Sequence, residues 1–190
     1  MAMLKVKITG IRPLLMNADT LSDPLHPMTK AHKLLTAKRT KTDENHEEIA
    51  RLSWEACMYH DEKLGPFMPG NNFEATLINA AKLSKLGTTF KRAVEVLEFK
   101  CPLEYSGPRD FDGLWDKGFV DGRSVKQQQS KIIRYRPRFE EWSFTCTIKY
   151  NSDTVDRGTL LKVIEDAGEQ IGICDYRPKY GRFTSEVIDG

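Results

Sequence analysis

Three segments of the chain alternate apolar and polar residues with a period of two, the pattern of a strand buried on one face only. They are residues 4–11, 142–150 and 182–188. Between the last two, residues 156–171 instead repeat apolar residues at helical spacing. A strand, a helix and a strand in this order place the two strands parallel through a right-handed crossover. We therefore expect all three strands in one sheet, with this helix on one of its faces.

Three further segments carry apolar residues at helical spacing, namely residues 28–39, 43–60 and 73–86. Asn71 or Asn72 offers a side chain that can cap the third of these helices. Residues 93–105 favour a strand, in which we expect Val94, Val96 and Phe99 to face inward. Because helices and strands are mixed along the chain, the pattern predicts an α+β fold.

Proline, glycine and aspartate interrupt this pattern in two long stretches, at about residues 12–66 and 106–139. We interpret them as insertions into a single domain of residues 1–190. The first insertion contains helices and forms a helical lobe. The second contains a loop around Trp115 and then residues 123–139, which predict an extended arm or a hairpin strand. Its run of glutamines at residues 127–129 has no apolar period, so we expect a mobile tip.

The composition is that of a soluble globular chain, since 39% of the 190 residues are hydrophobic and 29% are charged. A net charge of +2 is too small to indicate a nucleic-acid partner by itself. The distribution of charge is more informative, because residues 30–41 and 123–138 contain lysines and arginines without an acid. The acids gather at residues 43–62 and 153–169, as is typical of solvated helix faces.

Neither a targeting segment nor a metal site is indicated. Residues 1–7 alternate apolar and basic side chains, so we expect a strand there rather than a signal peptide, and no stretch approaches the roughly 18 apolar residues of a membrane span. The four cysteines lie far apart, without a Cys-x-x-Cys motif; they are Cys57, Cys101, Cys146 and Cys174. We expect a cytoplasmic protein with buried, reduced thiols and no metal or cofactor.

A five-residue pattern occurs twice, as Tyr-Arg-Pro-Arg-Phe at residues 135–139 and Tyr-Arg-Pro-Lys-Tyr at residues 176–180. A residue ahead of proline favours extended backbone, so basic and aromatic side chains would point to opposite sides. Each copy precedes a predicted strand, and we expect both copies to reach the same end of the sheet. Arginine matches phosphate geometry and aromatic rings can stack on bases, so the pattern favours a nucleic-acid partner. In the alternative, the aromatics fill the core and the arginines are merely solvated.

The candidate nucleic-acid-binding residues belong to the two copies, to the segment around Gly87 and to the arm. They are Arg134, Arg136, Arg138, Arg177, Lys179, Arg182, Lys82, Lys85, Lys91, Arg92, Arg123, Lys126, Lys131, Tyr135, Tyr176 and Tyr180. The basic residues would contact phosphates, which gives binding that depends on salt but not on base sequence. Those around Gly87 have an equally good alternative role at a helix C-terminus, where cations complement the helix dipole. Of the aromatics in the two copies, we expect at least two to anchor in the core.

Several short motifs together resemble the RAMP superfamily, the ferredoxin-like RNA-binding proteins of CRISPR effector complexes. They are Arg-Pro-Leu-Leu-Met at residues 12–16, Pro-Gly-Asn-Asn at 69–72 with Ala-Ala-Lys at 80–82, and Ala-Gly-Glu-Gln-Ile-Gly-Ile at 167–173 with Arg-Pro at 177–178 and Gly-Arg-Phe at 181–183. The chain looks most like the repeating backbone subunits of those complexes, or like phage or mobile-element relatives of them. The glycine-rich loop that RAMP proteins often carry near the C-terminus is represented only by Gly168, Gly172 and Gly181.

The resemblance implies a ferredoxin-like or RRM-like sheet with packed helices and an inserted basic arm, with residues 123–131 as a thumb. It implies a non-catalytic subunit that grips single-stranded RNA, or single-stranded DNA, along its backbone. Such a subunit would assemble with copies of itself or within a ribonucleoprotein complex, away from any membrane.

Two other functions stay open. An endoribonuclease on the same scaffold would need a general base, for which His26 and His32 are candidates. Asp19 and Asp23 follow the first strand, and some backbone subunits of CRISPR complexes cut target RNA with an aspartate placed comparably. An aspartate ahead of proline, such as Asp23, is more often a turn former, so we assign no catalytic residue. The other function is a structural, protein-binding part of a phage particle, which would not retain nucleic acid.

Overall fold

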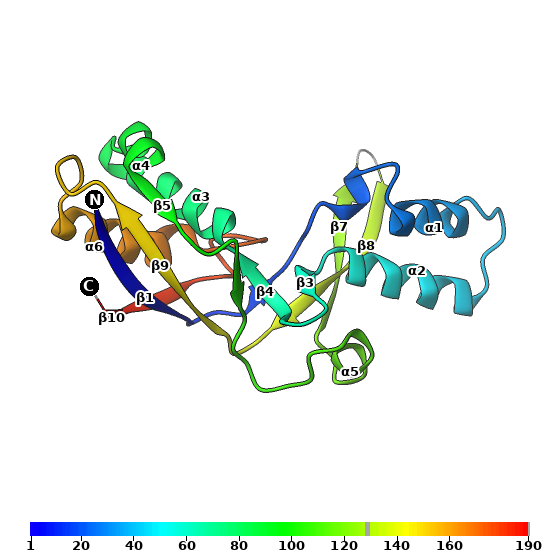
Figure 1. Ribbon diagram of the computed structural model, residues 1–190. Coiled ribbons are helices and arrows are strands. Elements are labelled where there is room, and N and C mark those ends of the chain that lie inside the picture. Colours follow the sequence, from blue (N-terminus) through cyan, green and yellow to red (C-terminus); the bar gives the residue numbers. More distant parts are fainter. Residues whose placement is uncertain (128–129, 190) are drawn as a thin grey trace. The chain divides into compact units, whose positions relative to one another are not determined.

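The computed structural model describes residues 1–127 and 130–189 and separates the chain into two compact units (Figure 1). The first unit contains Met1–Leu14, His60–Ser106 and Phe139–Gly190, and the second contains Leu15–Tyr59 and Gly107–Arg138. We expected one domain with two insertions. Segments from both predicted insertions make up the second unit, in which they pack against each other.

The first unit is built on a four-stranded sheet with the order β10-β1-β9-β5. Its strands are β1 (Ala2–Gly10), β5 (Val94–Val96), β9 (Ser143–Tyr150) and β10 (Phe183–Asp189). β1 pairs antiparallel with both β9 and β10, so these two run in the same direction on either side of it. The structure confirms that the three alternating segments share one sheet and that the last two are parallel.

Two of the helices in this unit connect strands of the sheet along the chain: α3 (Gly70–Ala81) lies between β1 and β5, and α6 (Arg157–Asp166) lies between β9 and β10. The predicted helix over residues 156–171 is α6 followed by a π-helical turn, η3 (Ala167–Ile171). Phe73 of α3 is fully buried, and its ring centroid lies 5.5 Å from that of Phe144 in β9 and 5.9 Å from that of Phe183 in β10. These rings join α3 to the face of the sheet that the alternating pattern predicted to be buried.

The segment after Pro69 departs from the helix predicted over residues 73–86. The backbone of Pro69 caps α3, and Asn71 and Asn72 lie inside its first turn without capping it. Gly70 permits this early start, because a Cβ there would collide with the carbonyl oxygen of Glu98. After Ala81 the chain forms a 3-10 turn, η2 (Lys82–Ser84), and a helix that the pattern did not predict, α4 (Gly87–Ala93).

The predicted strand over residues 93–105 is split into β5 and β6 (Lys100–Pro102). β6 belongs to a small second sheet with β4 (Gly65–Pro69) and β3 (His60–Asp61). Between β5 and β6, the carboxylate of Glu98 accepts hydrogen bonds from the backbone N of Thr147 at 2.7 Å and from its Oγ1 at 2.8 Å. The Glu98 side chain therefore takes the place of a backbone partner at the edge of β9, and the backbone after Glu98 turns away from that strand. Phe99, expected to face inward, is therefore 83% exposed.

The second unit combines two helices with a β-hairpin. The helices are α1 (Pro27–Thr36) and α2 (Asp43–Ala56), both predicted, and the hairpin consists of β7 (Val120–Gln127) and β8 (Ser130–Phe139). The strand β2 (Leu14–Leu15) also pairs with β8. Two short helices complete the unit, η1 (Thr20–Ser22) and α5 (Phe111–Asp116). None of the described helices has the length and apolar character needed to cross a membrane.

The arm over residues 123–139 is thus a hairpin strand, one of the two forms that the sequence predicted. The expected mobile tip falls on Gln128 and Gln129, which lie outside the described residues.

Trp54 of α2 organises the core of the second unit. Its Nε1 donates a hydrogen bond to the carbonyl of Phe119 at 2.8 Å, and its ring meets those of Phe111 and Trp115 edge-on.

Replacement of Phe73 by alanine should lower the free energy of unfolding by about 3–5 kcal/mol, because it leaves a cavity between α3 and the sheet. Urea denaturation followed by circular dichroism measures this change. Leu83→Ala is the control, since that side chain is 54% exposed and its loss should change stability by no more than about 0.5 kcal/mol. Equal stability of the two variants would contradict the central position of Phe73.

Candidate functional site

The candidate residues from the sequence fall into three groups. One lies on η2, directly after it and on α4, and contains Lys82, Lys85, Lys91 and Arg92. The next lies on the loop before β10 and contains Tyr176, Arg177, Lys179, Tyr180 and Arg182. The last lies on the hairpin of the second unit and contains Arg123, Lys126, Lys131, Arg134, Tyr135, Arg136 and Arg138. The first two groups therefore belong to the first unit, and the third does not.

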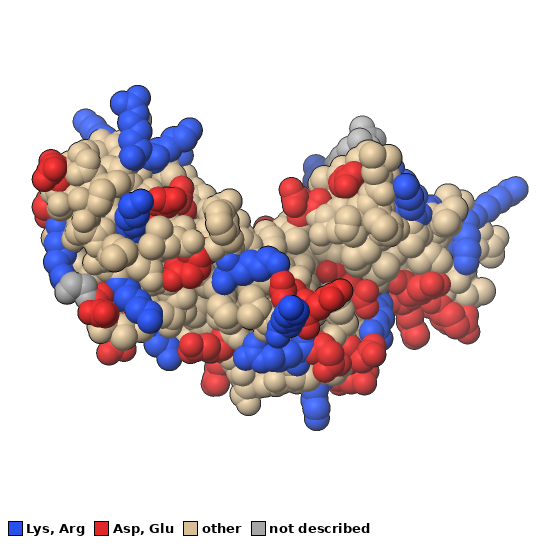
Figure 2. Space-filling model, viewed as in Figure 1, with Lys and Arg blue, Asp and Glu red and all other residues tan. Residues whose placement is uncertain are grey.

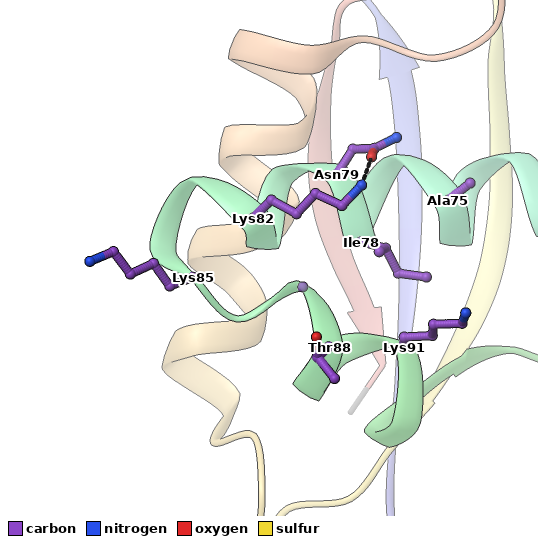
Figure 3. Close-up of a pocket in the computed structure, with 8 residues that line it drawn as sticks. Ala75, Ile78, Asn79, Lys82, Lys85, Thr88 and Lys91 are labelled. Carbon is purple, nitrogen blue, oxygen red and sulfur yellow. Dashed lines mark hydrogen bonds between the residues drawn. The ribbon is translucent and has the colours of Figure 1, made fainter.

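The three lysines of the first group line an open pocket of about 580 Å³, which we name the lysine pocket, whereas Arg92 does not belong to its described lining (Figure 3). Its lining includes Asn79, Lys82, Lys85 and Lys91, and no carboxylate among the described residues. Lys82 folds back and donates from Nζ to Oδ1 of Asn79 at 2.8 Å, whereas Lys85 extends away from the pocket. Figure 2 shows basic side chains projecting over α4. The pocket therefore presents positive charge to solvent.

Local backbone geometry places these lysines. Lys85 ends η2 with a φ of 61°, in the left-handed region, and thereby reverses the chain toward α4. Gly87 opens α4 close to α3, because a Cβ there would lie 2.7 Å from Cγ of Lys82. Lys91 and Arg92 occupy the last turn of α4 and are exposed. Their place at a helix C-terminus also fits the alternative role of complementing the helix dipole.

The second group lies on the loop of residues 172–182. Ile173 N donates to the carbonyl of Gly181 and Gly181 N to that of Pro13, both at 2.8 Å, which closes the loop at its base. Gly181 has a φ of +68°, and a Cβ there would collide with the carbonyl of Ile173. A Cβ on Gly168 would collide with the carbonyl of Phe183. Glycines that are spread along the sequence therefore meet at the base of one loop.

The copy of the repeat at residues 176–180 is a turn and not the extended segment that we expected. Tyr176 has a φ of 59°, and Tyr180 N donates to the carbonyl of Tyr176 at 3.2 Å. The two tyrosine rings meet edge-on at 5.3 Å, and Nζ of Lys179 lies 5.9 Å from the Tyr176 ring centroid. The turn therefore brings the two tyrosine rings together beside Lys179.

A second open pocket of about 580 Å³, which we name the loop pocket, adjoins the lysine pocket. Asn79 lines both pockets, so the two pockets are neighbours on the surface of the first unit. Arg177 and Asp175 contribute to the lining of the loop pocket. Among the described lining residues of the two pockets, Asp175 is the single carboxylate, against three lysines and Arg177. The surface is therefore cationic as a whole.

Most of the third group lies in β8, where the copy at residues 135–139 is extended as predicted, whereas Arg123 and Lys126 lie in β7. Arg134, Arg136 and Arg138 alternate there with other side chains, of which Phe139 is fully buried. This copy lies within a strand of the hairpin and not in a loop ahead of β9. The two copies precede strands that begin at the same end of the sheet, since Ser143 and Phe183 pair with Thr9 and Gly10 of β1, but one copy is a strand and the other a turn.

A buried carboxylate holds several of these arginines. Asp121, only 7% exposed, accepts hydrogen bonds from Nε and Nη2 of Arg123 at 2.8 Å each. Nη1 of Arg138 lies 3.6 Å from the same carboxylate, and Arg136 is the cross-strand neighbour of Asp121. These side chains therefore stabilise the hairpin. Lys126 and Lys131 face each other further along it and are exposed.

The replacement Asp121→Asn should lower the free energy of unfolding by about 1–3 kcal/mol, because it leaves arginine donors without their charged acceptor. Thermal and urea denaturation measure the loss. Asp116→Asn removes one carboxylate from an exposed position at the end of α5 and should be nearly neutral. A neutral Asp121→Asn variant would show that the arginines do not depend on this carboxylate.

Three of the four side chains considered for RNA cleavage, those of Asp23, His26 and His32, form local hydrogen bonds. Oδ1 of Asp23 accepts a hydrogen bond from Leu25 N at 2.8 Å, and Nδ1 of His26 accepts one from Met28 N at 3.2 Å at the start of α1. Asp19 is exposed at the start of η1 without a side-chain capping bond. Nε2 of His32 lies 3.0 Å from Oγ of Ser53. Within the described ranges, no group of three or more His, Cys, Asp or Glu residues could hold a metal ion.

Burial, assisted by the charge of Arg134, lowers the pKa of His32 below its ordinary value of 6.5. The unfolded chain therefore binds more protons than the folded protein just below pH 6.5, and this contribution to stability is lost as pH falls. We expect the free energy of unfolding to drop between pH 7 and pH 5 by more in the natural protein than in a His32→Gln variant. Urea denaturation at both pH values measures the difference. Identical pH dependence of the two proteins would contradict the lowered pKa.

No protein-family model matches the chain, and no curated protein matches it. The functional argument therefore rests on geometry and on the sequence pattern. Two residues that the sequence analysis missed are central to it, Asn79 and Asp121. Asn79 precedes Lys82 by three residues, a spacing at which helical side chains meet, so the predicted helix contained that signal. The pairing of Asp121 with Arg138 depends on the register of the hairpin, which the residues next to Asp121 in the sequence do not reveal.

Proposed function

We propose that the protein binds single-stranded nucleic acid, RNA foremost, by gripping phosphates on the surface formed by the lysine pocket and the loop pocket. The observation that carries the proposal is the sharing of Asn79, which joins the lysines of one pocket to Arg177 of the other. Phosphates repeat along a strand, so a continuous cationic surface can contact several of them in succession. Such contacts would bind strands of any sequence.

The order of the secondary-structure elements supports this proposal. A β-α-β-β-α-β order is that of ferredoxin-like domains, and RNA-recognition motifs use a four-stranded sheet whose aromatics stack on bases. On β1 and β9, however, the face opposite the core carries Lys5, Lys7, Thr145 and Thr147. Because these side chains offer no aromatic surface, we assign the main contacts to phosphates at the two pockets and not to bases on the open sheet.

One aromatic side chain of the cationic surface is suited to a base. Tyr176 is 42% exposed and lies beside Lys179 on the loop. Stacking of bases on aromatic rings is common in proteins that bind single strands and tolerates any base. In our proposal Tyr176 stacks on a base while Arg177 contacts a neighbouring phosphate. The resemblance to RAMP backbone subunits extends the proposal to copies assembled side by side along the strand, alone or in a ribonucleoprotein complex.

The double variant Lys91→Glu/Arg177→Glu removes one cation from each pocket. We expect it to weaken binding of fluorescein-labelled single-stranded RNA by at least about tenfold and to flatten the dependence of log K on log salt by about 0.7 for each lost contact, because fewer counterions are released. Fluorescence anisotropy at several salt concentrations measures both quantities. Single-stranded DNA of the same sequence, measured in parallel, determines the preferred strand.

The control is Lys63→Glu/Lys117→Glu, which changes the charge equally at exposed lysines outside both pockets. Equal affinity and salt slope of the two double variants would refute the assignment of this surface. Electrophoresis of the labelled RNA after incubation with and without divalent metal separates binding from cleavage, and we expect intact RNA. If the natural protein shows no salt-dependent retention of either strand, the structural protein-binding role replaces the proposal.

A further inference from the structure

The second unit contains a more enclosed pocket of about 480 Å³ that the proposed function does not use, named here the His32 pocket. Residues of η1, α1, α2 and β8 line it. Leu21, Ile49 and Ile132 supply apolar walls and are each only half-buried by the protein. A volume of this size lies within the roughly 300–1,000 Å³ typical of small-molecule sites. The walls therefore leave apolar area that a ligand of suitable size would bury.

Two cations also reach this pocket, Lys33 from α1 and Arg134 from β8. Neither forms an ion pair with another described residue, and no carboxylate belongs to the described lining. The cross-strand neighbour of Arg134 is Arg123, which is itself held by Asp121. Positive charge beside the apolar walls is thus uncompensated. This combination favours a ligand that has both an anionic group and an apolar part.

His32 and Ser53 add directional hydrogen-bonding groups, with 3.0 Å between Nε2 and Oγ. Burial keeps the pKa of His32 low, so its ring is neutral at pH 7 and offers one donor and one acceptor. The hydroxyl of Ser53 can also donate and accept. Groups of this kind suit the ring nitrogens and carbonyls of a heteroaromatic ligand better than they suit a purely aliphatic one.

We propose that the His32 pocket binds a nucleotide, with its phosphate at Arg134 and Lys33 and its base between the apolar walls. An inorganic anion would leave the walls exposed, and an uncharged ring would leave the cations unused. The nucleotide can be a free nucleoside monophosphate or the 5′-terminal nucleotide of a strand, since both present the same ring and phosphate. The inference does not rest on the function proposed above, because the pocket lies in the other unit and shares none of its residues.

Isothermal titration calorimetry with AMP, adenosine and inorganic phosphate tests the proposal on the natural protein. We expect saturable binding of AMP at one site, at least tenfold tighter than binding of either fragment. Arg134→Gln should weaken AMP binding about tenfold or more, because it removes a charge-assisted contact to phosphate. Lys117→Gln removes one charge at an exposed position of the same unit and should leave AMP binding unchanged. Ile49→Trp fills the pocket and should abolish binding.

The imidazole signals of His32 in the NMR spectrum give a readout that needs no variant, and they should shift as AMP is added. Competition with a 5′-phosphorylated oligonucleotide then separates the two sources. Displacement of AMP identifies a strand end as a ligand, and lack of displacement identifies the free nucleotide. The proposal is overturned if AMP shows no saturable binding up to millimolar concentration, if the His32 signals do not move, or if folded Arg134→Gln and Ile49→Trp proteins bind AMP as the natural protein does.

Discussion

The packing of Phe73 against the sheet is the contact on which the first unit depends. Its ring meets Phe144 of β9 and Phe183 of β10, strands that flank β1 on opposite sides. Asn79 lies near the end of α3, the helix that contains Phe73. Phe183 directly follows the loop of residues 172–182. A single aromatic cluster therefore links the lysine pocket to the loop pocket. Loss of this packing would disturb the cationic surface together with the core.

Density of basic residues along the chain proved a poor guide to where positive charge is available. Residues 123–138 have the longest acid-free basic stretch, yet Asp121, just outside it, holds Arg123 and lies close to Arg138. For the lysines around Gly87, the sequence favoured a role at a helix C-terminus as strongly as a role in binding, because cations complement the helix dipole there. There the side chains surround a pocket whose described lining has no carboxylate. Pairing in three dimensions, and not local composition, decides which cations can meet a phosphate.

The cationic surface and the His32 pocket differ in the ligand that each can accommodate. The first is open and lined by long lysine side chains, which suits a flexible polyanion that makes many weak contacts. The second combines apolar walls with a small number of polar groups, which suits one small ligand in a defined orientation. Asp121 contributes indirectly to the His32 pocket. It binds Arg123, which is the cross-strand neighbour of the pocket residue Arg134.

The sequence by itself determined the three alternating strands, the helices α1, α2 and α6 and the extended form of residues 123–139. Strand alternation and helical spacing are local, since they record which side chains along one element face the core. Only the tertiary structure decided the break at Glu98, the turn at residues 176–180 and the pairing of Asp121 with Arg138. Each of these depends on a group from far along the chain, respectively Thr147, Pro13 and the opposite strand of the hairpin. The residues of the basic segments were therefore predictable, whereas their gathering into a site was not.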